Sequence, residues 1–169
     1  MRYDELSETE KLELKVRAQK STLIDVWGEL APVQADNWSP RAQIAAEMLH
    51  GVSSVADIGC GLMTLKKYLP KDVQYIPVDC ISRSEDTIVV DLNQKPLPPI
   101  MADAAAALGL MEYLFDVSGF LQQLLQFEIS VITYNLSDSK EAYERPTMWV
   151  NALTRHDIES LFQDAGPAH

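Results

Sequence analysis

The sequence predicts an α/β fold with a doubly wound, mostly parallel β-sheet and helices on both of its faces. Three observations carry this prediction: short apolar runs alternate with helix-like segments, a glycine turn follows the first run, and acids follow the next two. Such alternation is typical of parallel sheets. Ligands bind these sheets at the carboxyl ends of the strands, so the residues directly after each strand are the candidates for a site.

The N-terminal third is predicted to be helical. Residues 4–30 place leucine, isoleucine, valine and tryptophan among charged residues at mostly helical spacing. Residues 31–38 contain Pro32 and are predicted to form a loop. Ser39 followed by Pro40 is typical of a helix start, and Gly51 of a helix end, which predicts a second helix over about 40–50.

From residue 54 onward the pattern predicts alternating strands and helices. The predicted strands are 54–58, 73–78, 87–90 and 130–134, and the predicted helices are 63–68, 117–126 and 155–165. Residues 102–110 are ambiguous, because their alanines favour a helix although a fourth strand belongs there. For the last helix, Thr154 is a suitable N-cap, Asp157 falls at the third helical position, and Gly166 is a suitable end.

Composition limits the classes of partner. One domain is the default for 169 residues, of which 47% are hydrophobic and 23% charged. The formal net charge of −11 argues against a nucleic acid partner. No apolar run is long enough for a membrane span, and the charged N-terminus is unlike a signal peptide. Cys60 and Cys80 have neither disulfide-framework nor metal-site spacing, so we expect a cytoplasmic protein without a metal.

The glycine turn is the most informative segment. Residues 55–69 read VADIGCGLMTLKKYL, in which Asp57, Gly59 and Gly61 close a short strand before a helix-like segment. Glycines let a ligand approach the main chain, and a helix start offers free N–H donors. Thr64 replaces the third glycine that dinucleotide-binding enzymes use around a pyrophosphate, which favours a cofactor without a pyrophosphate.

Acids follow the second and third predicted strands. Asp79 lies 18 positions beyond Gly61, where a carboxylate is suited to accept hydrogen bonds from ribose hydroxyls. Asp91 is expected either to meet an adenine amino group or to form an Asx turn with its neighbours. Further candidates follow the fourth and fifth predicted strands, facing a substrate or the far side of the cofactor: Gly109, Leu110, Met111, Glu112 and Tyr113, and then Tyr134 and Asn135.

These residues resemble the motifs of class I S-adenosylmethionine-dependent methyltransferases of the small-molecule type. VADIGCG is similar to their first motif, D/E-x-G-x-G-x-G, with Met63 at the last glycine, where it is expected to narrow the loop. VDC at 78–80, DLNQKPLP at 91–98, LGLMEYL at 108–114 and LTRHDIESLFQDAG at 153–166 resemble four later segments, in order. Tyr113 stands where many members carry histidine.

The resemblance implies a Rossmann-like core over 51–169, preceded by a helical lid over 1–50, within one domain. It implies that S-adenosylmethionine is the cofactor, with its methionine along Gly59 and Gly61, its ribose on Asp79 and its adenine near Asp91 or Leu92. The full cofactor-binding set is Asp57, Gly59, Cys60, Gly61, Asp79, Cys80, Asp91, Leu92 and Gly109. The expected substrate contacts are Trp38, Arg41, Tyr134, Asn135 and Trp149.

The family's sheet ends in an antiparallel hairpin after the last helix, whereas three residues follow Gly166 here. Without the hairpin, the fifth strand is an exposed edge that is prone to pairing. Either the sequence is a truncated or shortened form, which we favour, or a second copy of the chain covers the edge in a homodimer.

We therefore expect methyl transfer to oxygen or nitrogen of a small-molecule acceptor, such as a sugar or secondary metabolite. An oxygen acceptor requires a general base, whereas an amine requires only a neutral lone pair. Glu112 and Tyr113 are the candidate catalytic residues; His156 is a third option but favours the surface. The alternatives are a non-catalytic methyltransferase-like scaffold and a nicotinamide-dependent oxidoreductase. Thr64, in place of the third glycine, counts against the oxidoreductase.

Overall fold

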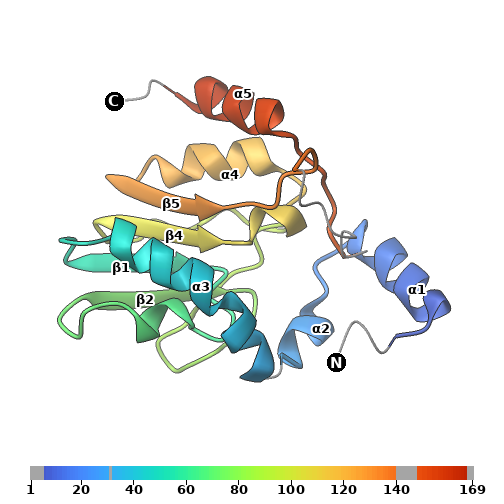
Figure 1. Cartoon of the computed structure of the whole chain (residues 1–169), viewed down its shortest axis with the longest axis horizontal. Coiled ribbons are helices and arrows are strands. Elements are labelled where there is room, and N and C mark those ends of the chain that lie inside the picture. Colours follow the sequence, from blue (N-terminus) through green and yellow to red (C-terminus); the bar gives the residue numbers. More distant parts are fainter. Residues whose placement is uncertain (1–5, 31, 140–147, 167–169) are drawn as a thin grey trace.

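The computed structural model describes residues 6–30, 32–139 and 148–166. In these residues five parallel strands form one sheet in the order β3-β2-β1-β4-β5 (Figure 1). The strands are β1 (Ser54–Ile58), β2 (Gln74–Asp79), β3 (Ile88–Val89), β4 (Ala104–Leu108) and β5 (Ile129–Thr133). The direction of strand order reverses between β1 and β4, which is where such sheets bind ligands. The predicted α/β doubly wound fold is confirmed.

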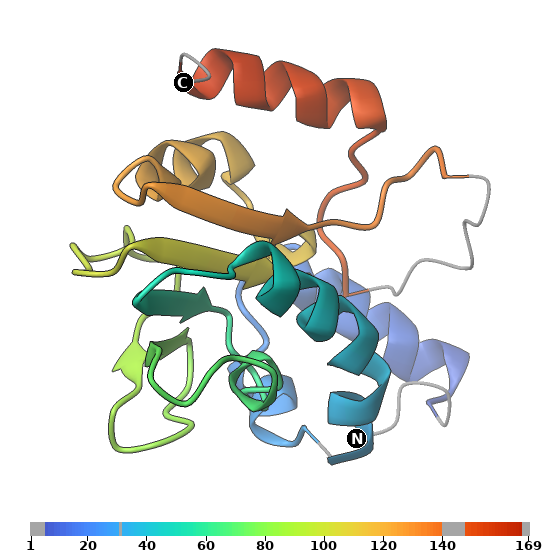
Figure 2. The same ribbon diagram turned by 60° about the vertical axis from the view of Figure 1, so that its left-hand side comes forward.

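Helices cover both faces of the sheet (Figure 2). One face packs against α3 (Pro32–Met48), and the other packs against α4 (Val117–Leu124) and α5 (Arg155–Ala165). Side chains of successive strand residues alternate between the two cores. The α3 core takes Val55, Ala104 and Ala106, and the α4 and α5 core takes Ala56, Ala105 and Ala107.

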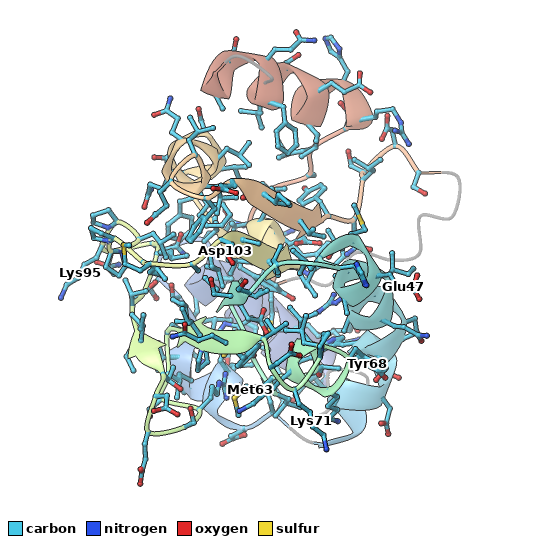
Figure 3. All side chains as sticks on the ribbon, turned by 90° about the vertical axis from the view of Figure 1, so that its left-hand side faces the viewer. Glu47, Met63, Tyr68, Lys71, Lys95 and Asp103 are labelled. Carbon is cyan, nitrogen blue, oxygen red and sulfur yellow. The ribbon has the colours of Figure 1, made fainter. Side chains whose placement is uncertain are left out.

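The ambiguous alanine segment is strand β4, in the middle of the sheet. Ala104 to Ala107 are each no more than 1% exposed, because helices or their side chains cover both faces. Burial on both faces overrides the helical preference of alanine. Asp103, labelled in Figure 3, precedes the strand and accepts hydrogen bonds from the backbone N–H groups of Ser53 and Ser54, which joins β4 to β1.

The C-terminal helix follows the sequence prediction. The Thr154 hydroxyl accepts from the Asp157 N–H, and the Asp157 carboxylate accepts from the Thr154 N–H. This reciprocal capping box satisfies two donors at the start of α5. The helix ends at Ala165, before Gly166 at φ +152°.

The helical prediction for 4–30 is wrong at residues 19–23, where the chain breaks between two helices. Two helices occupy this segment, α1 (Glu8–Ala18) and α2 (Ile24–Gly28), while residues 4 and 5 lie outside the described residues. Ala18 and Leu23 are buried on either side of the break, in a small core of their own with Leu14 and Val26. A bent segment brings both apolar ends into that core, which one straight helix cannot do.

The predicted loop over 31–38 is also wrong from Pro32 onward; residue 31 lies outside the described residues. Helix α3 begins at Pro32, where a missing N–H costs little, and so Pro40 is internal. Its ring removes the N–H that would bond the Asp36 carbonyl. The Ser39 hydroxyl is no N-cap either, because it donates to the Ala35 carbonyl at 2.9 Å.

Two further elements matter for the site. The predicted helix over 63–68 is instead a turn followed by the short 3-10 helix η2 (Leu65–Lys67). Helices α1 and α2 lie beyond the carboxyl ends of the strands (Figure 1), so α2 is near the strand ends that carry the predicted site.

No helix among the described residues is both long and apolar enough to cross a membrane.

Candidate functional site

A cavity of about 680 Å³ opens at the carboxyl ends of the strands. The expected cofactor-binding, substrate-binding and main catalytic residues all line this cavity, whereas two further candidates, Met111 and His156, do not. The lining candidates are Trp38, Arg41, Asp57, Gly59, Cys60, Gly61, Asp79, Cys80, Asp91, Leu92, Gly109, Glu112, Tyr113, Tyr134, Asn135 and Trp149. Its volume lies within the range of small-molecule sites, about 300–1,000 Å³. The geometry therefore brings the predicted residues together, whereas their individual roles stay predictions.

The glycine turn after β1 is held to β2. The N–H groups of Gly59 and Cys60 both donate to the Val78 carbonyl, at 2.8 and 3.0 Å. Gly59 and Gly61 have φ of +73° and +51°, which side chains other than glycine rarely adopt. The turn is thus a fixed wall of the cavity.

Side chains of the chain itself lie against both glycines. A Cβ on Gly61 would come within 3.1 Å of the Trp38 ring, and one on Gly59 within 2.9 Å of Leu110. Met63, which we expected to narrow the loop, is not among the residues that line the cavity. Its φ of +53° is left-handed, a conformation that glycine adopts more readily than methionine. The side chains that approach the two glycines are those of Trp38 and Leu110.

Asp79, at the end of β2, is a buried hydrogen-bonding centre. Its carboxylate accepts from the N–H groups of Gly61 at 2.8 Å and Ile81 at 3.2 Å. Arg83 forms an ion pair with it at 3.3 Å and donates to the Trp27 carbonyl at 3.0 Å. The sequence analysis missed Arg83, whose one signal is its place four residues after the acid. Asp79 thus links the glycine turn to α2.

Both cysteines lie beside the same carboxylate. The sulfur of Cys60 is 3.9 Å from Asp79 Oδ2, and that of Cys80 is 3.4 Å from Oδ1. Burial, aided by nearby carboxylates, raises the pKa of the Cys60 thiol strongly and raises the pKa of Cys80 to about 12. Both thiols are therefore neutral and weakly nucleophilic at neutral pH.

Asp57 lies at the floor of the cavity. The Tyr75 hydroxyl donates to Asp57 Oδ2 at 2.6 Å. Burial raises the pKa of Asp57 to about 7; the negative charge of Asp79 acts in the same direction, and the tyrosine hydrogen bond opposes both. Burial also raises the pKa of Tyr75. Asp57 can therefore change its protonation state near neutral pH.

Asp91 and Asn93 attach the N-terminal segment to the core. Asp91 Oδ1 accepts from the Thr22 hydroxyl at 2.6 Å and from the Asn93 N–H at 3.0 Å, so the Asx turn is present. The Asn93 amide donates to Thr22 and to the Tyr113 carbonyl, and its oxygen accepts from the Phe115 N–H. Sequence reasoning gave no role to Thr22, because a lone threonine between two helices carries no pattern.

Glu112 lines the cavity from the 3-10 helix η3 (Met111–Tyr113), which follows β4. It is 1% exposed, and its Oε1 accepts from the Asn135 N–H at 3.0 Å and from the Asn135 side-chain amide at 2.8 Å. The other oxygen, Oε2, is buried without a hydrogen-bond partner among the described residues. Glu112 and Asn135, which the sequence singled out separately, are thus in direct contact after β4 and β5.

Aromatic rings line the cavity near Glu112. The Trp27 and Tyr113 rings meet edge to face at 4.7 Å, and the Trp149 indole donates to the Tyr113 hydroxyl at 3.0 Å. The three tryptophans of the chain, including Trp38, all line the cavity. The sequence favoured packing for Trp27, and the structure gives it both packing and a place on the cavity wall.

Arg41 of α3 lies against the carboxyl end of β4. Its guanidinium carbon would be 3.0 Å from a Cβ on Gly109, and it lies 5.3 Å from the centre of the Trp38 ring. His156 is exposed on α5 and is not among the lining residues. In the described ranges, no group of three or more histidine, cysteine or acidic residues is placed to hold a metal ion.

The sequence matches no protein-family model, and it matches no curated protein. Solved structures do match: a proposed O-methyltransferase from Nostoc punctiforme has a TM-score of 0.69 at 14% identity, over 95% of this chain and 63% of that one. An S-adenosylmethionine-dependent methyltransferase from Archaeoglobus fulgidus has a TM-score of 0.58 at 18% identity, over 78% of this chain and 68% of that one. The [4+2]-cyclase SpnF has a TM-score of 0.59 at 16% identity, over 76% and 56%.

At such low identities these similarities establish the fold. The chain has the Rossmann-like fold of class I S-adenosylmethionine-dependent methyltransferases. It spans less than two thirds of the length of two of these matching structures. The cyclase among them indicates that one fold serves more than one reaction, so activity has to be argued from the cavity.

Proposed function

We propose that this protein is a methyltransferase that binds S-adenosylmethionine and methylates oxygen or nitrogen of a small molecule. The observation that carries the proposal is one cavity at the strand-order reversal, lined by the glycine turn, by Asp79 and by Glu112. Among proteins of similar fold, the N-terminal domain of EvdMO1 was crystallised with S-adenosylhomocysteine and, separately, with that compound and D-fucose present.

The residues present suit this cofactor. Gly59 and Gly61 have no side chains, so a ligand that displaces Trp38 and Leu110 can lie on their backbone. Four acids and two arginines line the cavity, which favours a ligand of net positive charge: Asp57, Asp79, Asp91 and Glu112 against Arg41 and Arg83. None of these features requires a pyrophosphate.

The sites for its parts follow the strand ends. Gly59 and Gly61 would hold the methionine part, Asp79 the ribose, and Asp91 or Leu92 the adenine. When bound, the cofactor supplies an electrophilic methyl group on a positively charged sulfur. The protein's contribution is to orient the acceptor and exclude water, and the aromatic wall of Trp27, Tyr113 and Trp149 is suited to both.

Turnover of the cofactor tests this proposal directly. Formation of S-adenosylhomocysteine is measured across a panel of sugars, amines and phenols. Asp79→Asn is expected to raise KM for S-adenosylmethionine about tenfold or more, because a charged hydrogen-bond acceptor is worth about 1.5–3 kcal/mol. Asp72→Asn, an exposed aspartate before β2, is the matched control and should leave KM unchanged. Equal KM values in the two variants would contradict the role of Asp79.

A second candidate is a methyltransferase-like scaffold that acts through partners. In its favour, side chains of the protein already lie where the cofactor would bind. Trp38 and Leu110 lie against the glycines of the turn, and Arg83 forms an ion pair with Asp79. Binding of the cofactor without turnover across the panel would favour this scaffold over the enzyme. The cytoplasmic location and the homodimer also stay predictions.

A further inference from the structure

Glu112 is the lining acid that the chain leaves half satisfied. Its Oε1 receives two hydrogen bonds from Asn135, whereas Oε2 receives none although the residue is 1% exposed. The other three lining carboxylates each have donors: a tyrosine hydroxyl on Asp57, backbone N–H groups and Arg83 on Asp79, and a threonine hydroxyl on Asp91. Of these four acids, Glu112 is the one with a buried oxygen that lacks a donor in the part of the chain that the structure describes.

A buried carboxylate oxygen without a donor is costly to a fold. Taking a charged oxygen out of water is unfavourable unless a hydrogen bond and a counter-charge replace the water. No residue that the structure describes donates a hydrogen bond to Oε2. Glu112 is among the residues that line the cavity, so a ligand that displaces the atoms covering Oε2 is in a position to supply the hydrogen bond and the counter-charge.

The surroundings of Glu112 favour a cation. Near Glu112 the cavity is lined by its chain neighbour Tyr113, by Trp27 and Trp149, which contact Tyr113, and by Tyr134, which precedes Asn135. Several of their polar atoms are already engaged, since the Trp149 indole donates to Tyr113 and the Tyr134 hydroxyl donates to Asn151. Aromatic rings also attract ammonium groups through their negatively polarised faces.

We propose that this end of the cavity binds an organic amine in its ammonium form, with Glu112 Oε2 accepting an N–H bond, and that this amine is the methyl acceptor. The second half of the proposal rests on the proposed function. An alcohol or phenol would supply a neutral hydrogen bond and leave the carboxylate charge uncompensated, whereas an ammonium group supplies the hydrogen bond and the charge.

The transfer balances with Glu112 as the proton acceptor. The bound ammonium gives one proton to Oε2, and the neutral nitrogen keeps its lone pair. This lone pair forms the bond to the methyl carbon, while the electron pair of the breaking carbon–sulfur bond stays on sulfur, which becomes neutral. The product is the N-methylated ammonium, and Glu112 then releases its proton to water.

Calorimetry with a matched pair of small molecules tests the amine site on the full chain. Phenethylammonium chloride and 2-phenylethanol are titrated at pH 7.5, with and without S-adenosylhomocysteine. We expect the ammonium compound to bind at least about tenfold more tightly than the alcohol, a difference of about 1.4 kcal/mol. Equal or tighter binding of the alcohol would overturn the proposal.

Two variants assign the preference to one carboxylate. Glu112→Gln keeps the shape of the side chain and removes its charge, so the preference for the ammonium compound should disappear. Glu159→Gln, an exposed glutamate of α5, is the matched control and should keep it. A preference that survives in Glu112→Gln would overturn the assignment to Glu112.

Two readouts separate the possible failures. Replacing an unpaired buried charge by an amide should leave the melting temperature of Glu112→Gln equal or higher; a lower value would indicate a structural role instead. If that variant does not fold, the proposal is judged by whether the wild-type protein binds phenethylammonium more tightly than 2-phenylethanol. If the wild-type protein does not bind S-adenosylhomocysteine, the proposed function is overturned. If the wild-type protein binds S-adenosylhomocysteine but does not prefer the ammonium compound to the alcohol, only the amine site is overturned.

Discussion

Asp57 is a carboxylic acid that the fold buries at 3% exposure, beside a second carboxylate. Its position could be predicted, because an acid that closes the first strand belongs to the glycine-turn motif. Its partner could not, because Tyr75, the second residue of β2, is paired with Val55 and reaches Asp57 two residues further along β1. Likewise, the place of Arg83 four residues after Asp79 is a weak signal, because the loop that carries it has no periodicity.

Stability should depend on pH through Asp57. Its pKa is raised from 3.8 to about 7 in the folded protein, so the native state holds the proton more tightly than the unfolded chain. Below pH about 4, Asp57 is protonated in both the folded and the unfolded state, so it does not lower the free energy of unfolding. As pH rises from about 4 to 7, the free energy of unfolding falls by roughly 4 kcal/mol, at 1.36 kcal/mol per pKa unit.

Asp57→Asn tests whether the free energy of unfolding falls as pH rises, because the amide still accepts the Tyr75 hydrogen bond and does not ionise. Urea unfolding should give the variant about the wild-type stability at pH 4.5 and a clearly higher stability at pH 8. The exposed Asp72→Asn variant should follow the wild-type curve at both pH values. Wild-type and Asp57→Asn curves that run parallel from pH 4.5 to 8 would contradict the raised pKa.

At the scale of elements, the sequence predicted the core well and the N-terminal region poorly. Helices α4 and α5 and four of the five strands lie where apolar periodicity and caps place them, within a few residues, whereas the alanine-rich segment of β4 is ambiguous from the sequence. The errors fall where local signals mislead: Ser39 and Pro40 form a typical helix start, yet they lie inside α3. Helix α3 forms there because tertiary packing buries Ala35, Ala42 and Ala45.

The contact of α2 with the core depends on the ion pair between Arg83 and Asp79. Arg83→Met keeps the apolar stem but leaves Asp79 buried without its counter-charge, which should cost about 3–5 kcal/mol of stability. The double variant Arg83→Met/Asp79→Asn should recover much of this loss, because no charge is then stranded. Urea unfolding of the two single variants and the double variant measures the coupling. Strictly additive losses would show that the pair is not coupled.

At the scale of the whole molecule, the sheet topology explains why residues far apart in sequence meet. Parallel strands present all their carboxyl ends at one edge, so Gly61, Asp79, Glu112 and Asn135 reach one cavity from four different strands. This is why the list of lining candidates could be drawn from the sequence alone. The aromatic wall and the attachments of α2 could not, because they depend on how the N-terminal segment folds over that edge.

The central claim is that this cavity holds an adenosyl cofactor without a pyrophosphate. The most direct measurement is calorimetry on the full chain with S-adenosylhomocysteine and, in parallel, with NADH. The account predicts saturable binding of one S-adenosylhomocysteine per chain and no binding of NADH. No heat with S-adenosylhomocysteine at millimolar concentration, or tighter binding of NADH, would contradict it.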